Sequence, residues 1–185
     1  MKKIVVLAFF LLAGSFVNAQ TSAPQNETRF GFTSGYVNTS FISDAPHPIL
    51  KVVDNPTFGK AIFVGAFADI FLGSSTFFKP EVIYHFGDRT AFLEVSPLFK
   101  QYLFNSRFHV LAGPQVRFII GPLAENYKRT GLELAGGLGY DITKDIFIQA
   151  KYSYEFTNRY EEGVEPTGGN EMHFETFSIG LGYRF

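Results

Sequence analysis

The sequence predicts an all-β chain that folds as an eight-stranded antiparallel up-and-down β-barrel and crosses a membrane. The first observation is the stretch from Phe174 to Phe185, where apolar residues alternate strictly with polar or small ones. The second is a leader of the secretory type. The third is composition: 46% of the residues are hydrophobic and 17% are aromatic, yet no apolar run after the leader has the length of a membrane-spanning helix. Such a composition suits strands that face lipid on one side.

The leader occupies residues 1–19. It begins with Met1-Lys2-Lys3, continues with an apolar run from Ile4 to Val17, and ends in small residues at Val17-Asn18-Ala19, so it predicts a signal peptide cleaved after Ala19. The alternative is a retained anchor, but the apolar run is shorter than the roughly 20 residues that a spanning helix needs.

The rest of the chain predicts one domain. Residues 20–28 are polar and predict a short periplasmic lead-in, and residues 29–185 predict the barrel. The chain contains no Cys, which excludes disulfides, a lipid-anchored Cys and Cys-based metal sites. The formal net charge of -1 offers no basic field, so nucleic acid is excluded as a partner.

Period-two alternation predicts the positions of the strands. The register of the second strand is the hardest to assign, and the better choice places Asp69 inward and Ile62 outward. Pro97 cannot donate a backbone hydrogen bond and predicts a bulge or local break, while residues 41–57 predict a long loop. Short connections alternate with longer ones, as expected when both termini lie in the periplasm. The strands are expected at about 29–40, 58–72, 76–86, 90–103, 108–120, 131–142, 146–156 and 174–185.

Three segments carry a resemblance to a known family. They are Leu93-Glu94-Val95-Ser96-Pro97-Leu98, Val110-Leu111-Ala112-Gly113-Pro114 and the terminal Gly180-Leu181-Gly182-Tyr183-Arg184-Phe185. With the leader, they make the chain similar to small outer-membrane β-barrel domains of the porin-like or PorT-like type, akin to the transmembrane domain of OmpA. The resemblance implies a bacterial outer-membrane location, with membrane lipid, the barrel assembly machinery and other envelope or secretion proteins as partners. Tyr183 and Phe185 then resemble the C-terminal assembly signal of such barrels.

The assigned registers place most charged residues on the inward parity, with nearly balanced signs. Eight strands enclose a space that side chains can just fill, so a plugged, salt-bridged lumen is expected, with a narrow pore or a proton path as the alternative. Lys151 is expected to pair with Glu133 or Glu155, and Ile148 to face acyl chains. The predicted lumen network consists of Lys79, Glu81, Glu94, Lys100, Arg117, Glu133, Lys151, Glu155 and Arg184.

Two other functional classes compete with a structural barrel. An enzyme would need His85 or His109 beside Ser96 or Ser153 and a carboxylate, but no local motif enforces that geometry, so a non-enzymatic barrel without cofactor or metal is expected. A secreted, soluble, lipocalin-like binding barrel would have the same strands with the faces exchanged. The segment Gly136-Gly137-Leu138-Gly139 lies within a strand, and its glycines are expected to make room for large neighbours rather than to bind phosphate.

Overall fold

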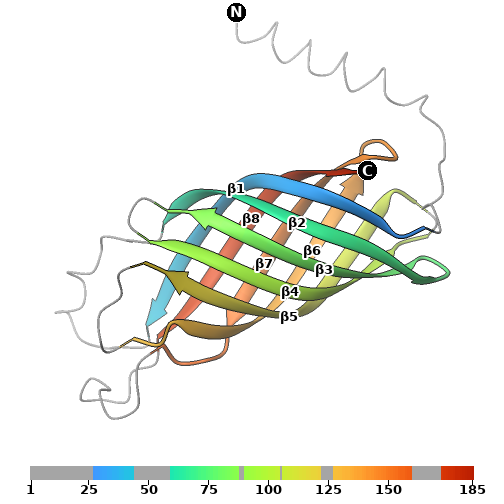
Figure 1. Cartoon of the computed structure of the whole chain (residues 1–185). Coiled ribbons are helices and arrows are strands. Elements are labelled where there is room, and N and C mark those ends of the chain that lie inside the picture. The colour runs from blue at the N-terminus through green and yellow to red at the C-terminus, as the bar shows by residue number, and fades with distance from the viewer. Residues whose placement is uncertain (1–26, 44–58, 88–89, 105, 122–126, 160–171) are drawn as a thin grey trace, which may run out of the picture.

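The computed structural model describes residues 27–43, 59–87, 90–104, 106–121, 127–159 and 172–185. Eight antiparallel strands form one closed barrel in the order β1 to β8, as the sequence predicts (Figure 1). The described residues contain no helix long and apolar enough to span a membrane. The predicted signal peptide lies outside these residues, as does most of the predicted lead-in. The strands are β1 (Arg29–Ser43), β2 (Lys60–Gly73), β3 (Thr76–Phe86), β4 (Ala91–Tyr102), β5 (Phe108–Ile120), β6 (Thr130–Asp141), β7 (Ile146–Glu155) and β8 (Met172–Arg184).

Pairing of β1 with β8 closes the barrel. The paired residues run from Gly31 with Arg184 to Ser43 with Met172. Closure leaves no strand edge with unpaired backbone groups, which hydrocarbon would not tolerate. The predicted start of a loop at residue 41 is wrong, because residues 41–43 pair with 172–174 and extend β1.

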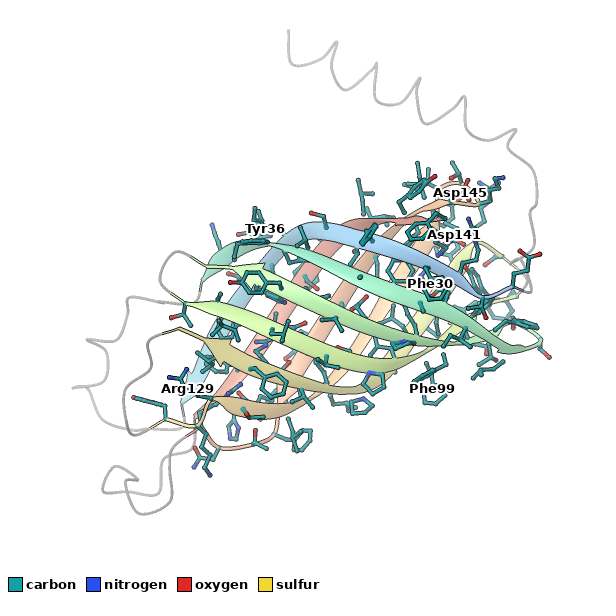
Figure 2. All side chains as sticks on the ribbon, in the orientation of Figure 1. Phe30, Tyr36, Phe99, Arg129, Asp141 and Asp145 are labelled. Atoms are coloured by element: carbon teal, nitrogen blue, oxygen red, sulfur yellow. The ribbon has the colours of Figure 1, made fainter. Side chains whose placement is uncertain are left out.

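The two ends of the barrel differ. The turn end carries the connections 74–75, 103–107 and 142–145 together with the C-terminus, whereas the loop end carries the connections 44–59, 87–90, 121–129 and 156–171 (Figure 1). Figure 2 shows Asp141 and Asp145 at the turn end and Arg129 at the opposite end. At the last turn, the Thr143 hydroxyl accepts hydrogen bonds from the backbone N–H groups of Asp145 at 3.2 Å and Ile146 at 2.9 Å. This side chain holds the turn without glycine.

The outer face of the barrel is apolar. Large hydrophobic side chains are exposed along every strand, including Ile62 at 61%, Leu138 at 66% and Leu181 at 55%. Asp69 in β2 is only 2% exposed, so the predicted register of that strand is confirmed. A water-soluble barrel would show the reverse arrangement, with polar side chains outside.

A pair of prolines interrupts one part of the wall. Pro97 in β4 lies opposite Pro114 in β5, and neither has an N–H to donate. Pairing between these strands stops after Val95 and resumes at Phe99 in the same register. Pro97 therefore produces a break rather than a bulge, while a register shift lies elsewhere, between Phe71 and Gly73 beside the first tight turn.

Glycines on the inner face leave room for rings on neighbouring strands. A Cβ at Gly182 would lie 2.1 Å from Cζ of Phe147, and a Cβ at Gly139 would lie 2.1 Å from Nε2 of His109. Both rings are buried. The bare backbone of β8 and β6 is thus part of the packing surface, and any larger residue there must displace a ring.

The substitution Gly182→Ala should lower the free energy of unfolding by about 1 to 3 kcal/mol, because the new methyl group collides with the buried Phe147 ring. Urea unfolding of the barrel in lipid vesicles measures the change. Gly136→Ala is the matched control, since its nearest neighbour, the Leu111 carbonyl oxygen, is 3.9 Å from the added Cβ. Equal stability of the two variants would contradict this packing.

Candidate functional site

The centre of the barrel holds charged side chains that contact one another. The Lys151 ammonium lies 3.0 Å from Oε1 of Glu81 and 3.4 Å from Oε2 of Glu94. Lys79 contacts the other oxygen of Glu81. Each of these side chains is at most 5% exposed. A lysine on β7 and a lysine on β3 therefore share one carboxylate, and the β7 lysine reaches a second one on β4.

Two contacts between charged side chains cross the interior, because the strands that supply them are not neighbours in the sheet. Lys151 on β7 reaches Glu81 on β3, and Arg184 on β8 reaches Asp69 on β2. Side chains from opposite walls can meet only inside the barrel. The charged side chains of these strands therefore meet inside the barrel.

Arg117 is a fully enclosed member of the network. Its guanidinium is fully buried and lies between two carboxylates: Nη2 is 2.5 Å from Oε1 of Glu94, and Nε is 3.0 Å from Oε1 of Glu133. Nη1 also donates to the Thr176 hydroxyl at 2.6 Å. The second oxygen of Glu133 accepts a hydrogen bond from the Gln115 amide at 2.6 Å. Five donors in a rigid fork make arginine suited to such a position.

A second group, the turn-end cluster, lies toward the short turns. Arg184 donates from Nε to Asp69 at 2.9 Å and from Nη2 to Asp141 at 2.8 Å. Lys100 contacts the same oxygen of Asp69, and the Tyr102 hydroxyl donates to Asp141 at 2.6 Å. The penultimate residue of the chain is therefore an interior ligand for two carboxylates.

A third group closes the loop end. Arg159 lies beyond the end of β7, yet it is 1% exposed and its Nε is 2.6 Å from Oε1 of Glu155. Its Nη1 donates to the Lys128 carbonyl at 3.2 Å, and the guanidinium lies 5.0 Å from the centre of the Phe174 ring. Burial lowers the pKa of Arg159, while the Glu155 carboxylate opposes that shift. An arginine remains charged under these conditions.

Aromatic rings separate and cover the charged groups. The Arg184 guanidinium lies 4.3 Å from the Phe147 ring centre, and the Lys79 ammonium lies 4.3 Å from the Phe67 ring centre. The Phe67 and Phe147 rings contact each other edge-on, with centres 5.4 Å apart. Cations held against ring faces in this way gain attraction without water.

The charges inside the barrel balance. Within the described part of the chain, the buried charged residues divide into six cations and six carboxylates. Within the strands as described, the two charged residues with outward parity are Lys60 and Glu175; both lie near strand ends at the loop end, and Glu175 contacts Tyr152. The buried cations are Lys79, Lys100, Arg117, Lys151, Arg159 and Arg184, and the carboxylates are Asp69, Glu81, Glu94, Glu133, Asp141 and Glu155.

The structure places all residues of the expected lumen network inside the barrel, but their pairing differs in one respect. Lys151 contacts Glu81 and Glu94 rather than Glu133 or Glu155, so that prediction is wrong. Parity assigns a side chain to a face, whereas the choice of partner depends on how strands on opposite walls are staggered. Tyr183 and Phe185, the predicted assembly signal, are exposed on the outer face.

Sequence reasoning missed Arg159, because it follows the last alternating residue of β7. The signal that could have found it is the i, i+4 spacing from Glu155. The role of Tyr102 was also missed. Phenyl rings inside the barrel were underestimated, since an interior expected to be polar contains Phe63, Phe67 and Phe147 as well.

The residues considered for catalysis do not assemble into a nucleophile and base in the described part of the chain. Ser96 donates to Gln115 at 3.0 Å, while Nη2 of Arg117 lies 3.5 Å from the Ser153 hydroxyl. His85 faces Glu94, with Nε2 3.1 Å from Oε1. Among the described residues, no group of histidine and acidic side chains could hold a metal ion.

The chain is similar to known proteins in its fold but not in its sequence. No family model matches the chain. No curated protein sequence matches it. Several solved structures share the architecture, including the following three. Neisserial surface protein A is 12% identical, with 84% of this chain and 97% of that chain covered and a TM-score of 0.51. The outer-membrane enzyme PagL is 11% identical (85% and 99% covered, TM-score 0.52), and Ail of Yersinia pestis is 14% identical (86% and 99% covered, TM-score 0.50).

The chain has the fold of small outer-membrane barrels. Its structural neighbours are eight-stranded proteins of that kind, so the resemblance seen in the sequence is confirmed for the fold. At identities of 11 to 14%, the likeness extends to architecture alone, and the enzymatic character of PagL belongs to PagL.

Removing the central arginine should strongly destabilise the barrel. Arg117→Met leaves Glu94 and Glu133 buried without their shared cation, and we expect a loss of about 3 to 5 kcal/mol in the free energy of unfolding. Adding Glu94→Gln to the same chain should recover part of that loss, because one uncompensated charge is removed.

Equilibrium unfolding in urea measures both effects. Arg129→Gln is the matched control: Arg129 donates to the exposed Gly121 carbonyl at 2.9 Å, and its loss should change stability by less than about 0.5 kcal/mol. If Arg117→Met costs no more than the control, the central cluster does not hold the interior together.

Proposed function

We propose that this protein is an integral barrel of the bacterial outer membrane whose lumen is plugged, and that it acts as a structural or interaction component of the envelope or of a secretion complex. The observation that carries the proposal is the interior itself: six buried cations and six buried carboxylates, among which Lys151 and Arg184 pair with carboxylates on strands that are not their neighbours. A protein built to pass solutes needs free space where this one has paired side chains.

The outer face supports the membrane location. Exposed leucine, isoleucine and phenylalanine side chains surround the barrel, whereas a charged side chain at the midplane would cost about 2 to 4 kcal/mol. Aromatic residues recur near both ends of the strands, such as Phe108 and Tyr140 at the turn end and Tyr154 and Phe156 at the loop end. Such girdles mark the interfaces of outer-membrane barrels. By this orientation, the turn end faces the periplasm.

Two features favour an interaction role over catalysis or transport. His85 faces Glu94 and His109 faces the Phe147 ring, both inside the barrel, where a lipid substrate has no access. The longest connections, 44–59 and 156–171, both join strands at the loop end, which faces outward from the cell in this orientation. Crosslinking in intact envelopes is the way to recover the partner.

In planar bilayers, the purified barrel should give no large, steady conductance, because paired side chains occupy the lumen. The double variant Glu94→Ala with Arg117→Ala removes a matched pair of charges and their bulk, and it should raise the conductance. This variant shows that the assay detects an opened barrel. A wild-type conductance equal to that of the double variant would overturn the plugged lumen.

A further inference from the structure

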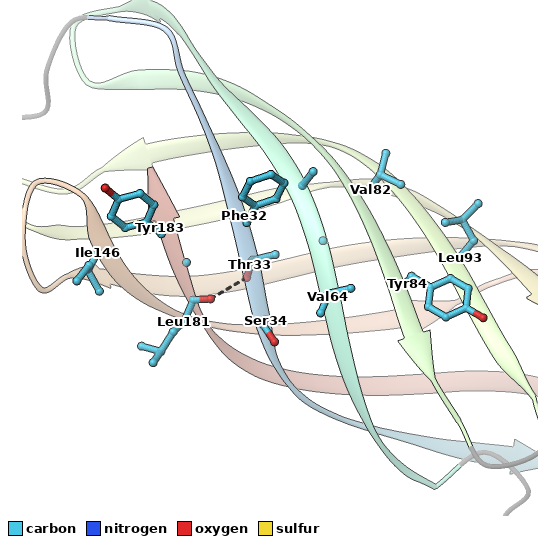
Figure 3. Close-up of a pocket in the computed structure, with 13 residues that line it drawn as sticks. Phe32, Thr33, Ser34, Val64, Val82, Tyr84, Leu93, Ile146, Leu181 and Tyr183 are labelled. Carbon is cyan, nitrogen blue, oxygen red and sulfur yellow. Dashed lines mark hydrogen bonds between the residues drawn. The ribbon is translucent and has the colours of Figure 1, made fainter. Parts of the chain in front are cut away.

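The outer wall carries a groove that the interior network does not explain. Its volume is about 730 Å³, and it crosses the outer surface from β4 through β3, β2, β1 and β8 to β7 (Figure 3). Its floor is the backbone of Gly65, Thr33 and Gly182, which are paired with one another across β2, β1 and β8. Ser34 and Ala66 beside this floor are smaller than the leucines, isoleucines and phenylalanines found elsewhere on the outer face.

Two rows of outward side chains form the walls of the groove. Each row follows residues that lie opposite one another on successive strands, so the groove runs along the direction of the hydrogen bonds. One row comprises Leu93, Tyr84, Val64, Ser34 and Leu181. The other comprises Val82, Ala66, Phe32, Tyr183 and Ile146.

The floor of the groove offers no free hydroxyl. The Ser34 hydroxyl donates to the Phe63 carbonyl at 2.9 Å, and the Thr33 hydroxyl donates to the Leu181 carbonyl at 3.3 Å (Figure 3). Both hydroxyls are therefore bonded to the wall. What remains is a long apolar trough open to the surroundings of the barrel.

Its length matches one acyl chain. Six strands about 4.8 Å apart give a trough of about 24 Å. Strands of such barrels are tilted by about 35 to 45°, so a trough perpendicular to them descends obliquely through the membrane. An oblique path of this length extends over about half of the roughly 30 Å hydrocarbon core, which is the depth of one leaflet.

A cationic side chain lies near the periplasmic end of the groove. Ile146 ends one wall, and Lys144, two residues earlier in the same turn, is exposed. Arg29 donates to the Lys144 carbonyl at 2.7 Å and also pairs with Asp145, which compensates that carboxylate. The Lys144 ammonium is thus available to a phosphate at the level where the acyl chain would begin.

We infer that this groove binds a phospholipid of the periplasmic leaflet, with its phosphate at Lys144 and one acyl chain along the trough toward Tyr84. The inference rests on the proposed outer-membrane location but not on the plugged lumen. If no ordered acyl chain filled the groove, the side chains of its two rows would lose the van der Waals contacts that such a chain makes with them.

The test uses native mass spectrometry of the barrel released from phospholipid vesicles, with increasing detergent as the competitor. The wild-type barrel should retain a phospholipid under conditions that strip it from Ala66→Phe, in which a ring fills the trough. Ala112→Phe is the matched control, because Ala112 is also exposed on the outer face but lies on β5, away from the groove; it should retain the lipid. Lys144→Gln should lose it at lower detergent than the wild type.

The possible failures are distinguishable. A barrel that does not float with the vesicles refutes the proposed location itself. A barrel that inserts but retains lipid equally in Ala66→Phe and Ala112→Phe refutes the groove alone. Retention that requires lipopolysaccharide, or a self-crosslinked dimer abolished by Ala66→Phe, assigns the groove to another occupant and overturns the inference.

Discussion

Buried charge needs a partner, and the interior of this barrel depends on meeting that requirement. An ionised side chain removed from water without compensation is among the most costly features that a fold can contain. Here each buried cation contacts at least one carboxylate, and Arg117 contacts two. Lys151 on β7 pairs with Glu81 on β3, and Arg184 on β8 pairs with Asp69 on β2, so these contacts form only when the barrel has closed. Charge pairing therefore contributes more to selecting one arrangement of the eight strands than to the net stability of the barrel.

Closure of the barrel also places the apolar side chains on its outer surface. Period-two alternation gives each strand one apolar and one polar face, and the closed sheet turns all apolar faces outward. Glycines such as Gly182 and Gly139 let large inner rings lie against bare backbone, which allows so small a barrel to hold both phenyl rings and ion pairs. Small outward residues also shape the outer surface. Because the side chains of Ser34 and Ala66 are short, they leave space for the groove.

Alternation makes the faces predictable from the sequence, because a residue's parity within a strand decides its side. Parity alone is enough to place Lys79 and Glu81 inside the barrel and Ile148 outside it. Partners across the interior could not be predicted, since the contact of Lys151 with Glu81 depends on the tilt and stagger of strands that never pair. Arg159 lies beyond the alternating pattern. The groove depends on Ser34 and Ala66 becoming neighbours only when β1 and β2 pair.

The central claim is that the two faces of each strand meet lipid and protein, respectively, and consecutive residues of β7 test it directly. The chain has no Trp, so a single Trp is a clean fluorescent probe. Phe147 is fully buried and Ile148 is 37% exposed. In vesicles of brominated phospholipid, Ile148→Trp should be strongly quenched and Phe147→Trp should keep its fluorescence. Equal quenching at the two positions, or stronger quenching at 147, would contradict the account.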